Sequence, residues 1–409
     1  MSAVSPLAPA RFPELPPLAG VRLAACEAGV RYKGRTDLML VELAPGSAVA
    51  GVFTQSTMPG QPVIWCRQCL PHGRIRAIVV NSGNANVFTG RAGWQVVERT
   101  AAAAARLLDC APNEVYIAST GVIGEPPPAD IIAAALPKAA SSLAADRWEA
   151  AARAIMTTDT FPKGATATAS IDGVTVRLNG FAKGSGMIAP DMATMLAYVF
   201  TDAALPTTVL QPLLAAAAAR SFNSMTVDGD TSTSDTLMLC ATQQARHTAI
   251  ADADDGRLAD FRRALDAVAI DLAQQVARDG EGASKFVTID VTGAESDKAA
   301  RRIGLTIGNS PLVKTAIAAG DANWGRIVMA VGRAGEKADR DRLSIAVGGV
   351  QIAAEGGPVP GYNEAPVAAH MAGREIHIAV DIGVGAGRAT VWTCDLTHGY
   401  VDITGSYRS

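Results

Sequence analysis

The order of apolar and polar residues along this 409-residue chain predicts strands and helices that follow one another throughout. Period-two or continuous apolar runs are typical of strands, and alanine-rich amphipathic segments are typical of helices. Strands are predicted at residues 48–54, 76–81, 174–178, 195–201, 286–292 and 343–347. Helices are predicted at residues 94–109, 130–136, 147–156, 208–221, 260–278 and 310–319, the last with Pro311 in its first turn. Because the two kinds of element interleave, the expected fold class is α/β, arranged as α+β layers.

The composition supports a folded chain with a large core. Apolar residues make up 49% of the sequence and charged residues only 18%, whereas disordered chains show the opposite balance. The net charge is −3, and lysine and arginine are scattered, so the basic stripe of a nucleic-acid binder is missing. The first seventeen residues lack the pattern of a signal peptide, and no long apolar run occurs. We therefore expect a cytoplasmic protein with neither a nucleic-acid nor a membrane partner.

The cysteines give one conspicuous pattern. Cys66 and Cys69 are spaced as in a redox dithiol or half of a zinc site, and His72 follows them. However, no second metal pair follows at usable spacing, and no clear strand-to-helix context surrounds them. The expectation is packing or surface thiols in a reducing compartment, with no metal.

A possible nucleophile lies at the start of a predicted strand. Residues 183–197 (KGSGMIAPDMATMLA) place a glycine-rich turn, Pro190 and Thr194 directly before an apolar run. If Oγ of Thr194 attacks the Ala193 carbonyl, hydrolysis of the resulting ester exposes an α-amine on Thr194 itself. Such an amine has a pKa of about 7.7 to 8.0, so it can accept the hydroxyl proton near neutral pH. Nucleophile and base would then be one residue.

The same residues allow other interpretations. A glycine-rich segment before a strand is also an ordinary structural turn. A phosphate-binding loop is a weaker alternative, because the segment lacks the full Gly-x-x-x-x-Gly-Lys-Ser/Thr pattern and precedes a strand instead of opening a helix. Local chemistry alone leaves the choice between a catalytic threonine and a structural turn open.

Several longer motifs, in a fixed order along the chain, indicate a protein family. They are residues 183–197 together with 81–86 (NSGNAN), 118–124 (ASTGVIG), 156–163 (MTTDTFPK), 226–233 (TVDGDTST) and 321–326 (DANWGR). From about Val30 to the C-terminus the chain resembles the ornithine acetyltransferase family of arginine biosynthesis, whose members are glutamate N-acetyltransferases.

The resemblance implies a fold, a maturation step and a reaction. The fold would be the ornithine acetyltransferase/aminopeptidase-like one, with self-processing of the N-terminal-nucleophile type. Autocleavage between Ala193 and Thr194 would give an α chain of residues 1–193 and a β chain of residues 194–409, assembled as two α and two β chains. N-acetylornithine would acetylate Thr194, ornithine would leave, and glutamate would accept the acetyl group to become N-acetylglutamate. No cofactor is implied, although some members also use acetyl-CoA as acetyl donor.

The resemblance also assigns residues. Thr120 and Gly121 match the oxyanion hole, which binds the negatively charged oxygen of a tetrahedral intermediate. The matched substrate-binding positions, besides Thr194, are Thr160, Lys183, Glu281, Thr404 and Ser409. A lysine suits the α-carboxylate that the substrates share, and a glutamate suits their amino groups. The chain departs from the family pattern at Thr404, Asp191 and Ser234, where asparagine is usual.

The sequence is also compatible with two rival functions. The first is an amidase or aminopeptidase of the same architecture, in which water resolves the acyl-enzyme. The second is a non-catalytic binding protein that keeps the fold and does not cleave itself.

Overall fold

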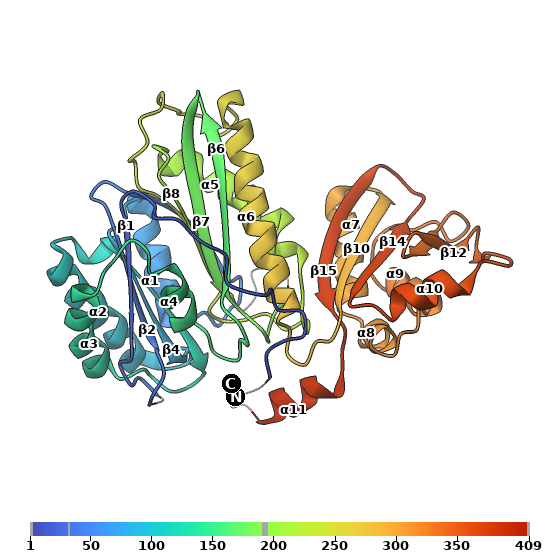
Figure 1. Ribbon diagram of the computed structural model, residues 1–409, viewed down its shortest axis with the longest axis horizontal. Coiled ribbons are helices and arrows are strands. Elements are labelled where there is room, and N and C mark those ends of the chain that lie inside the picture. Colours follow the sequence, from blue (N-terminus) through green and yellow to red (C-terminus); the bar gives the residue numbers. More distant parts are fainter. Residues whose placement is uncertain (1–2, 32, 190–194, 407–409) are drawn as a thin grey trace.

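Two β-sheets lie face to face in the first two thirds of the chain (Figure 1). The computed structural model describes residues 3–31, 33–189 and 195–406. The first sheet has the order β1-β2-β4-β5, formed by Val21–Cys26, Leu38–Leu43, Ala77–Asn84 and Val115–Val122. The second has the order β3-β9-β8-β7-β6, formed by Ala48–Phe53, Thr236–Ala241, Leu196–Thr201, Val174–Lys183 and Lys163–Ile171.

An apolar layer fills the space between these two sheets. It combines side chains from both inner faces with α1 (Gln61–Cys69) and α4 (Trp148–Ala154). Trp148 of α4 packs edge-on against Phe200 of β8, with ring centroids 5.7 Å apart. Aromatic side chains bury much apolar surface per residue, so this contact contributes to holding α4 against the second sheet.

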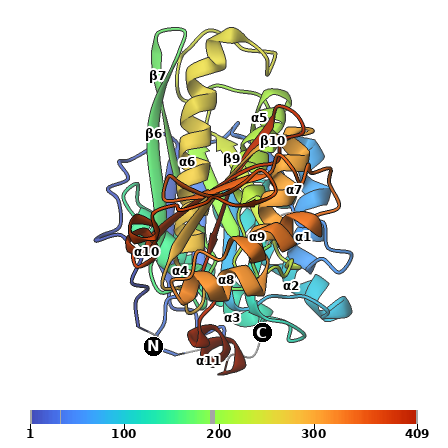
Figure 2. The same cartoon turned by 90° about the vertical axis from the view of Figure 1, so that its right-hand side faces the viewer.

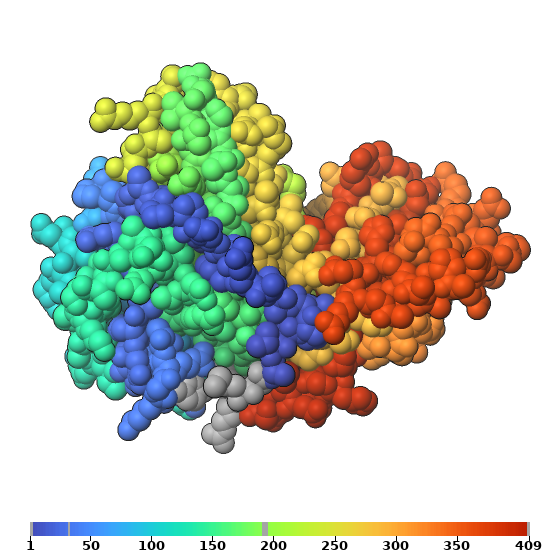
Figure 3. Space-filling view, in the orientation of Figure 1, coloured from blue at the N-terminus to red at the C-terminus, as the bar shows by residue number. Residues whose placement is uncertain are grey.

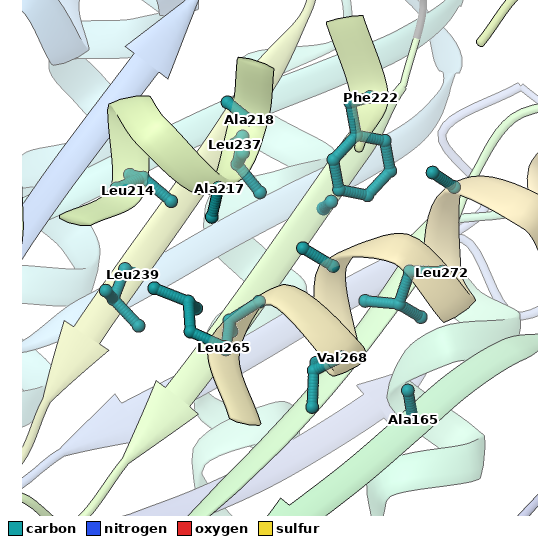
Figure 4. Close-up of a cluster of buried hydrophobic side chains, with 14 of the residues drawn as sticks. Ala165, Leu214, Ala217, Ala218, Phe222, Leu237, Leu239, Leu265, Val268 and Leu272 are labelled. Carbon is teal, nitrogen blue, oxygen red and sulfur yellow. The ribbon is translucent and has the colours of Figure 1, made fainter. Parts of the chain in front are cut away.

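Helices cover the outer faces of the sandwich. α2 (Gly90–Leu108) and α3 (Ala129–Ser141) pack on the first sheet, and α5 (Thr207–Arg220) and α6 (Ala259–Arg278) pack on the second. In α6, the buried residues Phe261, Leu265, Val268 and Leu272 recur every three or four positions and form one face. Figure 4 shows the last three of them. The central strands β8 and β9 are buried on both sides, which explains their continuous apolar sequences.

The C-terminal third forms a separate layered unit beside the sandwich (Figures 1 and 2). Its sheet has the order β13-β12-β11-β14-β10-β15. The strands are β10 Phe286–Ala294, β11 Ser344–Val347, β12 Val350–Ala354, β13 Gly357–Pro358, β14 Glu375–Asp381 and β15 Gly387–Cys394. The helices are α7 Asp297–Gly308, α8 Pro311–Ala318, α9 Trp324–Gly332 and α10 Glu364–Met371, which share its core. The last helix, α11 (His398–Ser406), returns toward the sandwich.

The N-terminal segment links these units. In Figure 3 it runs across the face of the sandwich toward the C-terminal unit. Asn179 of β7 donates a hydrogen bond to the Pro16 carbonyl at 2.7 Å, and Arg374 donates to the Pro6 carbonyl at 2.7 Å. The segment is therefore hydrogen-bonded to both parts of the molecule.

The structure confirms the predicted α/β layering and each of the predicted strands and helices, with shifted ends. Pro311 is the first residue of α8, as expected. Cys66 and Cys69 lie on α1 and are buried, and burial raises the pKa of both thiols, that of Cys69 to about 11. Both are packing thiols, as predicted. Among the residues that the structure describes, no helix is long and apolar enough to cross a membrane.

Candidate active site

A cavity of about 200 Å³ opens where the ends of the two sandwich sheets meet the C-terminal helix. Its lining includes Thr120 of β5, Lys183 of β7, Glu281 of the loop after α6, and Tyr400 and Thr404 of α11. These residues are far apart in sequence, and the fold places them around one space. Five of the positions predicted from the sequence thus line this cavity, namely Thr120, Gly121, Lys183, Glu281 and Thr404.

The predicted oxyanion hole lies at the end of β5. Thr120 is 3% exposed, and Gly121 has a φ of +125°, a backbone angle that favours glycine. Gly121 pairs with Gly83 of β4, and a Cβ at position 121 would lie 2.4 Å from the Gly83 carbonyl carbon. The tight approach of the two strands therefore requires glycine at position 121, beside the Thr120 hydroxyl.

Lys183 ends β7 inside the cavity, with only 3% of its surface exposed. Its Nζ donates hydrogen bonds to the hydroxyl oxygens of Thr157 at 2.8 Å and of Thr120 at 3.2 Å. The nearest carboxylate oxygen in an ion pair with Lys183 is Oδ2 of Asp159, at 4.0 Å. Burial lowers the pKa of Lys183, and Asp159 only partly offsets that effect. A buried ammonium without a close carboxylate is well suited to bind an anionic group.

A second buried lysine lies on the neighbouring strand. Lys163 of β6 is 0% exposed, and its Nζ lies 2.7 Å from Asp159 Oδ1 and 2.6 Å from Asp279 Oδ2. Asp159 also accepts hydrogen bonds from the backbone N–H groups of Thr157 and Gly184, at 3.0 Å and 2.6 Å. Burial alone would raise the pKa of Asp159, but Lys163 and Lys183 outweigh burial and hold that pKa well below its usual range. This ion-pair cluster therefore holds the segment at Thr157 and the backbone at Gly184, directly after Lys183.

The structure does not place Thr160 in the cavity lining. The Thr160 hydroxyl donates to Asp279 and accepts a hydrogen bond from the Ser5 N–H at 2.9 Å. The Thr160 side chain is therefore engaged by the Lys163 cluster, and its predicted contact with substrate gains no support from its position. Thr157 and Thr158, in the same motif, line the cavity instead.

Glu281 also lines the cavity and lies on the loop that follows α6. Its carboxylate accepts a hydrogen bond at 2.8 Å from the Thr404 hydroxyl of α11. Gly282 has a φ of +73°, and a Cβ there would lie 2.3 Å from the Tyr400 backbone nitrogen, so glycine is needed for α11 to pack this closely. Thr404, which stands where the family usually has asparagine, therefore still contacts Glu281.

Two aspartates hold the chain on either side of residues 190–194. Before that segment, Asp228 accepts hydrogen bonds from the backbone N–H groups of Met187 and Ile188 at 2.6 Å and 2.8 Å. After it, Asp235 Oδ1 accepts from the Met195 N–H at 3.0 Å. Asp235 is fully buried, and burial raises its pKa well above the usual range. The chain is therefore anchored at Met187–Ile188 and again at Met195.

Three predicted positions, Ala193, Thr194 and Ser409, lie outside the described residues, as does Asp191. The register of β8, which begins two residues after Thr194, shows where this strand lies. Leu196, the first residue of β8, pairs with Lys183 on β7 and with Thr236 on β9. The start of β8 therefore lies beside the cavity lysine.

Some cavity residues were not predicted from the sequence. Thr157, Asp228 and Tyr400 line the cavity, and the first two lie in the motifs at residues 156–163 and 226–233. The Tyr400 hydroxyl donates to Asp228 at 3.4 Å, and burial raises the pKa of Tyr400 to about 12. A motif marks a segment without saying which of its side chains points inward, so only the fold identifies them.

The geometry defines a class of protein. A buried hydroxyl, a glycine at a strand end and a lysine ammonium around one cavity are groups of the kind that stabilise negative charge on a carbonyl oxygen. The class is that of acyl-transfer enzymes, on an ornithine acetyltransferase/aminopeptidase-like fold.

Comparison with known proteins specifies the family. The ArgJ family model matches residues 22–409. The chain is 62% identical to the arginine biosynthesis bifunctional protein ArgJ of Gluconobacter oxydans, covering 99% of this chain and 96% of that protein. It is 57% identical to the ArgJ protein of Rhizobium meliloti, covering 100% and 99%. The crystal structure of ArgJ from Bacillus halodurans is 38% identical with a TM-score of 0.50, covering 51% of this chain and 98% of that chain. The chain belongs to the ArgJ family.

Proposed function

We propose that this chain is a glutamate N-acetyltransferase of arginine biosynthesis that takes its acetyl group from N-acetylornithine. The observation that carries the proposal is the cavity in which Thr120, Gly121, Lys183 and Glu281 meet beside the start of β8. Family membership makes the chain an acyltransferase of arginine biosynthesis, and the cavity contains groups for both ends of an amino-acid substrate.

The proposed mechanism begins with self-cleavage between Ala193 and Thr194. The Thr194 hydroxyl then attacks the acetyl carbon of N-acetylornithine, and the α-amine of Thr194 takes up the hydroxyl proton. The C–N bond breaks, ornithine leaves with that proton, and glutamate attacks the acetyl-threonine to give N-acetylglutamate. Thr120 and Gly121 donate to the oxyanion in both half-reactions.

The substrate-binding roles follow from charge. Lys183 binds the α-carboxylate, and Glu281 faces an amino group, with Thr404 hydrogen-bonded to its carboxylate. Ser409 would contribute from the chain end. The proposal includes no metal and no organic cofactor, with acetyl-CoA as the alternative donor to be tested, a cytoplasmic location, and an assembly of two α and two β chains.

Intact-mass measurement under denaturing conditions, combined with an acetyl-transfer assay, tests this function. We expect two fragments that join at Ala193/Thr194, and transfer of labelled acetyl from N-acetylornithine to glutamate. Thr194→Ala should abolish both, since it removes the attacking hydroxyl. Release of free acetate without N-acetylglutamate would favour the amidase alternative, and a chain that stays intact and inactive would favour the binding protein.

A further inference from the structure

The contact between Lys183 and Thr120 carries information beyond substrate binding. An ammonium group has three hydrogens and no lone pair, so in the 3.2 Å contact Lys183 donates and the Thr120 hydroxyl oxygen accepts. The single hydroxyl proton of Thr120 must then point away from Lys183. Because Thr120 lines the cavity and is otherwise buried, that proton is available to a group inside the cavity.

We propose that Lys183 is a positioning residue of the oxyanion hole: its ammonium holds the Thr120 hydroxyl with the proton directed at the oxyanion and strengthens that hydroxyl as a donor. The proposal rests on the function proposed above, and it adds a role that does not depend on a substrate carboxylate. Hydrogen bonds to an ionised group are roughly twice as strong as neutral ones, and donors in a chain polarise one another.

The surroundings of Lys183 favour this role. Asp159 could have neutralised the ammonium, but its carboxylate is engaged by Lys163 at 2.7 Å and by the N–H groups of Thr157 and Gly184. Among the residues that the structure describes, Lys183 instead donates to two hydroxyls, those of Thr120 and Thr157. Its positive charge therefore lies directly behind the hydroxyl that faces the reacting carbonyl, with one hydrogen left for a substrate carboxylate.

In the reaction step, Lys183 keeps its proton. The Thr194 Oγ–carbon bond forms, the carbonyl electron pair moves onto oxygen, and the α-amine receives the threonine proton. Thr120 O–H and Gly121 N–H donate to that oxygen. When the tetrahedral intermediate collapses, the carbonyl re-forms and the leaving group departs with the proton from the α-ammonium.

An acetyl donor without a carboxylate separates this role from carboxylate binding. The probe is p-nitrophenyl acetate, and the measurement is the single-turnover rate of nitrophenol release per cleaved molecule, after prolonged incubation of each variant to allow self-cleavage. Acetylation is located on the 194–409 fragment by mass spectrometry. We expect Lys183→Met to slow acetylation roughly 10- to 100-fold, the loss of one charge-assisted hydrogen bond. Thr120→Ala should slow it roughly 100- to 1,000-fold. The double variant should be no slower than Thr120→Ala alone, because both changes act through one hydroxyl.

Self-cleavage gives a second readout, because it involves no substrate carboxylate. Slow cleavage in both Lys183→Met and Thr120→Ala, with rescue by the positively charged Lys183→Arg, would support the proposal. Lys183→Gln keeps a neutral donor and tests the charge if the methionine variant does not fold, as judged by circular dichroism. Lys298→Met, at an exposed position on α7, is the matched control.

The failures are distinguishable. If the wild-type 194–409 fragment is never acetylated, the proposed function itself is wrong. If wild type is acetylated, and Lys183→Met cleaves itself and reacts with p-nitrophenyl acetate at the wild-type rate while only the KM for N-acetylornithine rises, Lys183 serves the carboxylate alone and the proposal is overturned.

Discussion

Lys163 and Lys183 are both buried on adjoining strands, but their surroundings differ. Lys163 pairs with Ala182 in the register of β6 and β7, so it lies next to the cavity lysine. Two carboxylates, Asp159 and Asp279, contact Lys163 at 2.7 Å and 2.6 Å. Lys183 instead contacts two hydroxyls, and the nearest carboxylate oxygen in an ion pair with it within the described part of the chain, Oδ2 of Asp159, is 4.0 Å away. The first lysine is electrostatically compensated within the protein. The second has charge left to act on a bound group.

The pKa values differ in the same sense. Burial lowers the pKa of both lysines, but the two carboxylates outweigh burial at Lys163 and raise its pKa. At Lys183 burial prevails and the pKa is lowered. We conclude that the cluster around Lys163 is structural and that it holds the Thr157 segment and Gly184 in place around Lys183.

The largest effect should follow from removing the structural cation. Lys163→Met leaves Asp159 and Asp279 buried without their shared partner, and breaking a buried ion pair in this way costs about 3 to 5 kcal/mol. Urea unfolding followed by circular dichroism measures this loss. Lys183→Met should cost clearly less, since it removes a buried charge that has no close carboxylate. Equal losses in the two variants would contradict the division between the lysines.

The two lysines should also differ in how they affect folding stability at alkaline pH. The raised pKa of Lys163 means that its stabilising contribution is complete below the unfolded pKa of about 10.4 and is lost as pH rises through the higher folded value. Lys183 has a lowered pKa, so in the folded protein it loses its proton at a lower pH than a free lysine does. Between its folded pKa and the unfolded pKa the unfolded state binds more protons, so the contribution of Lys183 to stability rises with pH in that range.

We therefore expect acetyl transfer to decline on the alkaline side before the protein unfolds. Parallel pH profiles of transfer rate and of the unfolding midpoint check this order. Lys183→Arg should move the alkaline decline to higher pH, because arginine stays charged. A decline of activity that coincides with unfolding would argue against the assignment.

The smallest effect concerns Thr160. Thr160→Val removes a hydroxyl that donates to Asp279, at an expected cost of about 1.5 to 3 kcal/mol in stability. Since Thr160 does not line the cavity, the KM values for N-acetylornithine and glutamate should stay unchanged. Thr157→Val is the matched comparison, and there we expect the KM values to change. A raised KM in Thr160→Val would instead support the substrate contact that the family resemblance predicts for Thr160.

The predicted cleavage site does not coincide with a boundary between folding units, and the sequence did not predict this. The predicted boundary at residues 193 and 194 falls between β7 and β8, which are neighbours in one sheet. The proposed α and β chains thus share a sheet and are not separate folding units. A chemical motif marks a cleavage site without regard to sheet boundaries, so the motif could not reveal this arrangement.

The sequence by itself determined the layered fold class, the predicted strands and helices, the family resemblance and the residue types around the cavity. Apolar periodicity and ordered motifs are local properties of the chain, so they can be read without coordinates. Only the tertiary structure decided that Thr157 faces the cavity while Thr160 faces Asp279, and that Lys183 donates to Thr120. Those choices depend on side-chain direction and on strands that meet across more than sixty residues, as β5 and β7 do at Thr120 and Lys183.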